Sequence, residues 1–273
     1  MGRRVDKGVE SPGISSIVEL NTLPHPVRDE IYLRLIPDEL LVTFGLSRSR
    51  LLDGTGYPPA RITAPDGAPW ARVELRVSPD DRDPALRLAI EMSSLSVPEL
   101  SLVQLNDPRA PRYAIDRDED GQDTLLGTVS RNETEERRAL EAGLAPGQVR
   151  RGLRMLAAVL TAMDEFCRLL GREFYLVEPL FYHSAILYER RGCDYITGRD
   201  RMDEIHAGFQ PGGRLYRRLD DRAPFRRRGF YAFARGRSWA IHDGILGEPW
   251  SGVKMYRAPR ALASVSTFPG GRY

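Results

Sequence analysis

Apolar and polar residues alternate with a period of two in three successive stretches of the chain, "WARVELRV", "ALRLAIEMS" and "ELSLVQLND". This period places successive side chains on opposite faces, which is typical of half-buried strands. Turn-forming residues in "SPDDRDP", "SVP" and "DPRAP" separate and follow these stretches. We therefore predict an antiparallel meander that starts near residue 69, with "RYAIDRD" and "TLLGTV" as two further short strands.

A helical pattern precedes the meander. Residues 1 to about 20 are polar and predict a loose start. Apolar residues then recur at helical spacing after Pro26, and Pro37 ends this first helix. A second helix is predicted to end near Gly45. Residues 47–68 are rich in Gly, Pro and Asp and predict a long loop.

The period changes again after the meander. The stretch "ETEERRALEAG" predicts a charged helix that ends at Gly143, and "PGQVRRGLRMLAAVLTAMDEFCRLLG" predicts the longest helix, which ends at Gly171. A strand in "EFYLVEP" and a helix in "HSAILYERRG" follow, with Ser184 as the candidate N-cap and Gly192 as the C-terminal glycine. The last predicted strands are "RGFYAFA" and "GVKMYRA".

This order of elements predicts an α+β fold around a mixed, mostly antiparallel sheet flanked by helices. We divide the chain into three parts. Residues 1–65 form an N-terminal segment of helices and loops, and residues 66–200 form the core. Residues 201–273 form a C-terminal extension that completes or covers this core.

Composition and charge limit the class of protein and the compartment in which we expect it. The chain has 273 residues and a formal net charge of only +2, so it is not a polycation. The two cysteines, Cys167 and Cys193, form no CxxC pair and favour a reducing, cytoplasmic compartment. No apolar run approaches the roughly 18 residues of a membrane helix, and the N-terminus lacks the apolar region of a signal peptide, so we expect no membrane association.

Two motifs within residues 69–200 resemble a known family. "GQVRRGLRMLAAVLTAMDEFCRLLG" looks like a phosphate-binding turn followed by a helix, and "AILYERRGCDYITG" is similar to "LYEKLGF" followed by a final hairpin. With the order of meander, long helix, strand and helix, they resemble the GCN5-related N-acetyltransferase (GNAT) family. The resemblance implies transfer of an acyl group from acetyl-CoA, or another acyl-CoA, to an amine of a small molecule or a peptide.

The resemblance implies a phosphate site at the turn before the long helix. A helix N-terminus beside a glycine binds anions through its free backbone N–H groups. The residues expected there are Gln148, Arg150, Arg151, Gly152 and Leu153. The chain departs from the family's Gln/Arg-x-x-Gly-x-Gly/Ala pattern, because with Gly152 as its central glycine, Val149 and Arg154 replace a polar and a small residue. The alternative interpretation is an ordinary helix start with solvated arginines.

The resemblance also implies catalytic residues. Tyr188 lies at the position of the family's general acid, which protonates the leaving thiolate. Glu178 and His183 are the candidates for the base that deprotonates the amine. The alternative for Tyr188 is a buried aromatic with a structural hydroxyl. The residues around "DEIH" define no ligand set, so we predict no metal site.

A second reading concerns residues 214–237, "RLYRRLDDRAPFRRRGFYAFARGR". Arginines alternate with aromatic residues there, a pattern that can hold single-stranded nucleic acid through phosphate contacts and base stacking. The rival function is therefore a non-catalytic protein that binds nucleic acid or another anionic partner. The plain alternative is a charged loop with a buried strand.

Overall fold

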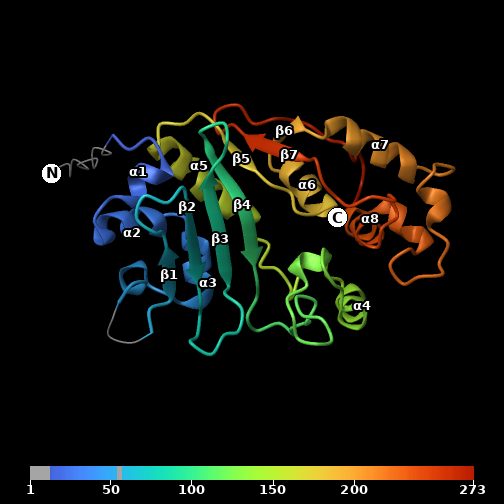
Figure 1. Cartoon of the computed structure of the whole chain (residues 1–273), viewed down its shortest axis with the longest axis horizontal. Helices are drawn as coiled ribbons and strands as arrows, with labels where there is room; N and C mark the ends of the chain where they lie inside the picture. Colours follow the sequence, from blue (N-terminus) through green and yellow to red (C-terminus); the bar gives the residue numbers. More distant parts are fainter. Residues whose placement is uncertain (1–12, 54–56) are drawn as a thin grey trace, which may run out of the picture.

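A mixed sheet of seven strands forms the centre of the protein (Figure 1). The computed structural model describes residues 13–53 and 57–273. The strand order is β1-β2-β3-β4-β5-β7-β6, and every neighbouring pair is antiparallel except β4 and β5. This confirms the α+β class with a mostly antiparallel sheet. The strands are β1 (Ala60–Thr63), β2 (Trp70–Leu75), β3 (Leu86–Met92), β4 (Pro98–Leu105), β5 (Tyr175–Val177), β6 (Asp194–Thr197) and β7 (Lys254–Arg257).

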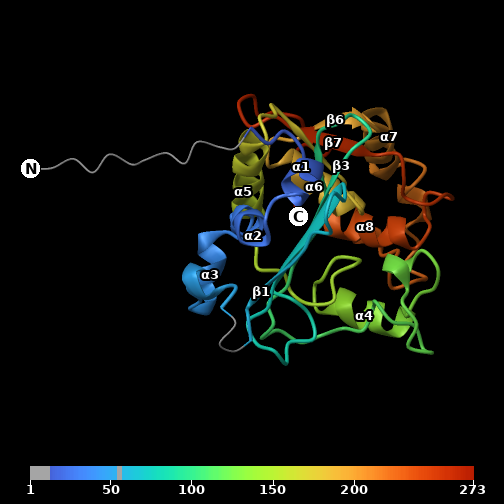
Figure 2. The ribbon, with the colours of Figure 1, turned by 60° about the vertical axis from the view of Figure 1, so that its left-hand side comes forward.

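Helices pack on both sides of this sheet. They are α1 (Ile17–Asn21), α2 (His25–Leu33), α3 (Asp38–Phe44), α4 (Glu133–Glu141), α5 (Leu156–Leu169), α6 (Tyr182–Glu189), α7 (Arg199–Phe209) and α8 (Ala234–His242). Figure 2 shows α2, α3 and α5 on one side of the strands, with α4 and α8 on the other. Tyr32 of α2 stacks on Phe166 of α5, with ring centroids 5.9 Å apart, which joins the N-terminal helices to the long helix.

The predicted meander is confirmed as β2, β3 and β4. The long loop predicted for residues 47–68 is wrong in part, because it contains β1 and a short 3-10 helix. A four-residue edge strand between Gly- and Pro-rich segments leaves too short a pattern to detect. The strands predicted in "RYAIDRD" and "TLLGTV" are also wrong, since these segments contribute only an isolated bridge and a 3-10 turn. The prediction of a loose start falls largely on residues 1–12, outside the described residues, and it is wrong from Ile17 on, where α1 begins and buries Ile17 and Leu20.

The longest helix begins later than its sequence pattern predicts. Gly147 has a φ of +80°, and the chain stays irregular until α5 begins at Leu156. Arg154 has a φ of +60°, a left-handed conformation that a helix excludes. The residues that we expected in the first turns of the helix therefore form an irregular segment that precedes it.

Helix α6 also begins in a different way from the prediction. Its N-cap residue is Phe181, so Ser184 lies inside the first turn and does not cap it. Gly192 has a φ of +82°, as expected for the glycine that follows a helix. The predicted strand "RGFYAFA" is wrong, because residues 228–232 form a 3-10 helix that leads into α8.

The C-terminal part of the chain belongs to the sheet. Strand β7, which confirms the strand predicted in "GVKMYRA", lies between β5 and β6. The chain makes a long helical excursion over residues 198–253 between β6 and β7. A buried ion pair fixes β7 to the long helix: the guanidinium of Arg257 donates two bonds of 2.8 Å to Asp164, whose carboxylate also accepts the hydroxyl of Tyr175 at 2.9 Å.

Candidate functional site

Strands β4 and β5 are paired over a very short distance and then part. Only Glu99 and Leu100 pair with β5, and the last bond runs from the N–H of Glu178 to the carbonyl of Leu100, at 3.2 Å. Beyond this point β4 continues to Leu105 with β3 as its only strand partner. A bulge at Ser101 shifts its register there. One edge of β4 is therefore left open where the two strands separate.

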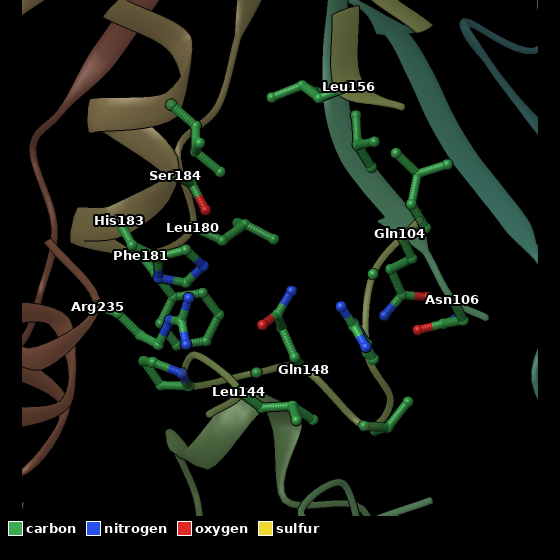
Figure 3. Close-up of a pocket in the computed structure, with 18 of the residues that line it drawn as sticks. Gln104, Asn106, Leu144, Gln148, Leu156, Leu180, Phe181, His183, Ser184 and Arg235 are labelled. Carbon is green, nitrogen blue, oxygen red and sulfur yellow. The ribbon is translucent and has the colours of Figure 1, made fainter. Parts of the chain in front are cut away.

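A cavity of about 680 Å³ lies along this open edge. Its walls come from the second half of β4, residues 142–156, and the segment from Glu178 through α6. Leu126, Arg235 and Tyr273, which are distant in the sequence, complete it. Figure 3 shows Gln104 and Asn106 on one wall, His183 and Arg235 on the opposite wall, and Gln148 between them.

Two backbone hydrogen bonds shape the turn before α5. The chain leaves β4 and returns about 45 residues later, where the N–H of Asp107 donates to the carbonyl of Arg151 at 2.9 Å. The N–H of Tyr113 donates to the carbonyl of Val149 at 2.8 Å. A Cβ on Gly152 would lie 3.3 Å from the carbonyl oxygen of Leu105. This glycine therefore allows the returning chain to pass close to the end of β4.

The N-terminus of α5 opens toward the cavity. Leu156, the first residue of this 14-residue helix, lines the cavity, and Met155 provides no side-chain cap. The first helical bond runs from the N–H of Val159 to Met155. In the part of the chain that the structure describes, the N–H groups of residues 156–158 have no partner. Unsatisfied N–H groups at the positive end of a helix dipole favour an anion.

The structure separates the five residues expected at a phosphate site into two groups. Gln148, Arg151 and Gly152 line the cavity. Arg150 does not, because its guanidinium bonds Asp83 at 2.8 Å and also donates to the carbonyl of Ala110. Leu153 packs half-buried against the hydrophobic core.

Three exposed arginines line the cavity. Arg151, Arg154 and Arg191 all contribute to its lining and are exposed. The side chains of Arg154 and Arg191 make no ion pair or hydrogen bond within residues 13–53 and 57–273. Positive charge that no carboxylate neutralises raises the local concentration of anions.

Tyr188 of α6 is 5% exposed and lines the same cavity. Its hydroxyl has no hydrogen-bond partner among the described residues. Burial raises the pKa of Tyr188, and the neighbouring Cys193 and Glu178 add to the effect. The hydroxyl therefore keeps its proton near neutral pH and has none of the partners that a purely structural tyrosine would need.

Glu178 lies where the two strands part. Its carboxylate is half-buried, lines the cavity and has no hydrogen-bond partner in the described chain. Burial raises the pKa of Glu178, the carboxylate of Glu99 raises it further, and the ammonium of Lys254 partly offsets both. A carboxylate with a raised pKa beside a cavity is suited to accept a proton.

His183 is 5% exposed and lies at the start of α6, next to Phe181, with their ring centroids 5.6 Å apart. Its Nδ1 lies 2.9 Å from the hydroxyl oxygen of Ser238. Burial, with the charges of Arg235 and His242, lowers the pKa of His183 to about 3. The ring is therefore neutral at pH 7.

Several cavity residues gave no signal in the sequence. They are Gln104, Asn106, Arg191, Arg235 and Tyr273. They lie in four separate regions of the chain, and only the folded structure brings them together. Arg154 was expected from the sequence to add charge at the phosphates, and it does line the cavity. The left-handed backbone conformation of Arg154 could not be predicted, because an arginine side chain does not favour it.

The arginine-rich segment 214–237 differs from a nucleic-acid platform. Most of its arginines bond to the protein itself, for example Arg218 to the carbonyl of Ile245 at 2.6 Å and Arg226 to Asp243 at 2.7 Å. Arg237 is buried over the ring of Phe268. Phe225 is also buried and stacks on Trp239.

No group of three or more His, Cys, Asp or Glu side chains among the described residues could hold a metal ion. No helix in this part of the chain is long and apolar enough to cross a membrane. A comparison of the chain with protein-family models, with curated proteins and with solved structures finds no match.

Proposed function

We propose that the protein is an acyl-CoA-dependent N-acyltransferase that uses direct attack of an amine on the thioester. The observation that carries the proposal is the cavity at the parting of β4 and β5. It brings the unpartnered groups of Tyr188 and Glu178 into the same space as the open N-terminus of α5. The sheet order and the α+β class are compatible with the GNAT-like architecture that the sequence motifs suggested.

The N-terminus of α5 and its arginines would hold the phosphates of CoA. The register expected from the sequence centred the family pattern on Gly152. The backbone favours a different register, which starts at Arg151, with Leu156 in place of the last small residue and Arg154 in place of the central glycine. This position has a φ of +60°, which glycine adopts without strain. The side chain of Arg154 would add a positive charge to the anion site, and its attraction for the anion would offset the strain of the left-handed backbone.

The open edge of β4 suits the amide-containing arm of CoA. An extended ligand that lies beside an unpaired strand can bond its N–H and C=O groups as a further strand would. The free edge begins after Leu100 and lines the same cavity as the N-terminus of α5. The thioester would then lie near Glu178 and Tyr188.

The chemistry requires proton transfers at the amine and at the sulfur. Glu178 would take a proton from the ammonium of the acceptor, directly or through water, so that the amine nitrogen can attack the thioester carbonyl. The C–N bond forms first and gives a tetrahedral intermediate. This intermediate then collapses: the C–S bond breaks, the sulfur takes the proton of Tyr188, and the second proton lost by the nitrogen returns to the Tyr188 oxygen through water. His183 is a weaker candidate for the base, because its Nδ1 is held by Ser238 and its pKa is far below 7.

Turnover with a panel of amines tests this proposal. The purified protein is mixed with acetyl-CoA and each amine, and the release of CoA thiol is followed together with the mass of the product. The expected result is an amine that gains an acetyl group at the rate of thiol release. Absence of turnover and of binding with both acetyl-CoA and longer acyl-CoA thioesters would reject the function.

Nucleic-acid binding through residues 214–237 has less support. A stacking platform requires exposed rings and free guanidinium groups. In this segment Phe225 is buried, and Arg226 is ion-paired with Asp243. A nucleic-acid binder would show an affinity that falls steeply with salt and is lost when Arg227 and its neighbours are replaced.

A further inference from the structure

The cavity has a second polar wall that the proposed reaction does not use. It lies across from β4 and contains His183, Arg235 and Phe181 (Figure 3), and the ring of Tyr273 lies next to Arg235. His183 is 95% buried, and its Nε2 has no hydrogen-bond partner in the described part of the chain. This ring nitrogen belongs to a buried side chain and lies on the wall of a cavity without a partner, which points to a ligand there.

The hydrogen bonds of Ser238 favour one tautomer of His183. The backbone N–H of His183 donates to the hydroxyl oxygen of Ser238 at 3.4 Å. The same hydroxyl lies 2.9 Å from Nδ1 and can donate its own proton there. In this tautomer Nε2 carries the ring proton and is a hydrogen-bond donor to the cavity.

Arg235 provides a positive charge next to this donor. Its guanidinium donates one bond, through Nη1, to the carbonyl of Gly143 and lies 5.4 Å from the centre of the Tyr273 ring. The other N–H groups of Arg235 have no partner among the described residues. The charge of Arg235 also contributes to the lowered pKa of His183, which indicates that the two groups are close.

The geometry points to a carboxylate site on this wall, which would bind an acyl acceptor that carries both an amine and a carboxylate. Arg235 would hold the carboxylate, and Nε2 of His183 would donate a further hydrogen bond to it. A guanidinium recognises the planar carboxylate through two parallel bonds. This inference rests on the proposed function, and it specifies the acceptor as an amino acid or a related zwitterion.

A phosphate of CoA has similar anionic chemistry and is the other source to consider. The open N-terminus of α5 begins at Leu156, which lies beside β4 in Figure 3, and with Arg154 it already provides for phosphates, whereas His183 and Arg235 lie on the opposite wall.

The test compares each common amino acid with its own carboxamide, in turnover with acetyl-CoA. The carboxamide keeps the amine and the side chain but removes the negative charge. The variants are Arg235→Gln and Arg235→Lys, with Arg227→Gln as the control. Arg227 is exposed, does not line the cavity and makes no side-chain bond within the described residues. Thermal denaturation verifies that each variant is folded.

We expect at least one amino acid to exceed its carboxamide in kcat/KM by about tenfold or more, the effect of one charged hydrogen bond. Arg235→Gln should abolish this preference, Arg235→Lys should retain part of it, and Arg227→Gln should retain all of it. Equal kcat/KM values for acids and carboxamides in the wild type would overturn the inference. It would also be overturned if Arg235→Gln lowered the affinity for CoA but not the affinity for dephospho-CoA. That result would mean that Arg235 binds the phosphate of CoA.

Calorimetry with the same amino acids separates this inference from the proposed function. Binding of an amino acid that Arg235→Gln abolishes, without any acetyl-CoA turnover, would uphold the carboxylate site and reject the reaction. Turnover of amines without discrimination between acids and carboxamides would uphold the reaction and reject the site. Absence of both binding and turnover would reject both.

Discussion

Replacing Tyr188 with Phe removes one hydroxyl group and keeps the ring that fills the core. In a purely structural interpretation this hydroxyl would have a hydrogen-bond partner, and its loss would destabilise the fold. In the described structure it has none, although the residue is 5% exposed. The two interpretations therefore predict opposite results for stability and for rate.

The expected magnitudes follow from these contacts. A buried hydroxyl without a partner costs about 1–3 kcal/mol, which access to the cavity partly offsets. The free energy of unfolding of Tyr188→Phe should therefore stay the same or rise by up to about 1 kcal/mol. A general acid contributes about 100- to 10,000-fold to the rate, so kcat should fall by a factor in that range.

Urea denaturation and CoA thiol release measure the two quantities, with Tyr175→Phe as the matched control. The hydroxyl of Tyr175 bonds Asp164 at 2.9 Å and does not line the cavity. Its loss should lower the free energy of unfolding by about 1–3 kcal/mol with little effect on kcat. A Tyr188→Phe variant that loses stability and keeps its rate would refute the assignment of Tyr188 as the acid.

Three further predictions concern the walls of the cavity. Because the pKa of Glu178 is raised, kcat/KM should fall as the pH is lowered through this pKa, and Glu178→Gln should be slow at every pH; a pH profile that Glu178→Gln leaves unchanged would exclude it as the base. Arg154→Gly should raise the free energy of unfolding by about 1 kcal/mol, because it relieves a φ of +60°, and urea denaturation that shows a loss would contradict this. Gly147→Ala would place a Cβ 2.4 Å from the ring of Phe181 at a φ of +80°, so thermal denaturation should show a loss of about 1–3 kcal/mol; an unchanged Tm would show that this wall is not tightly packed.

The strands of the meander could be predicted from the sequence because a period of two is a local property. Strand β7 could also be recognised, but not its position, since its partners β5 and β6 lie about 60 to 80 residues earlier in the chain. The same limit applies to the parting of β4 and β5. The point at which they separate depends on how many residues of two strands, distant in the sequence, remain paired. No local residue pattern predicts that number.

The part of the candidate site that lies in one short segment could be predicted from the sequence. Glu178, His183 and Tyr188 lie within eleven residues, and all three line one cavity. The phosphate turn was harder to place, because the apolar pattern of α5 extends backward past its true start at Leu156. Arg150 illustrates the remaining difficulty, since its partner Asp83 comes from the loop between β2 and β3.

Calorimetric titration of acetyl-CoA into the wild type and two charge-reversal variants tests the central claim most directly. Arg154→Glu reverses a charge at the open N-terminus of α5, and Arg227→Glu makes the same change in net charge away from the cavity. We predict that the wild type and Arg227→Glu bind acetyl-CoA equally, and that Arg154→Glu binds it at least about tenfold more weakly. Equal binding by all three proteins would contradict the phosphate site, and no binding to the wild type at millimolar acetyl-CoA would contradict the proposed use of acetyl-CoA.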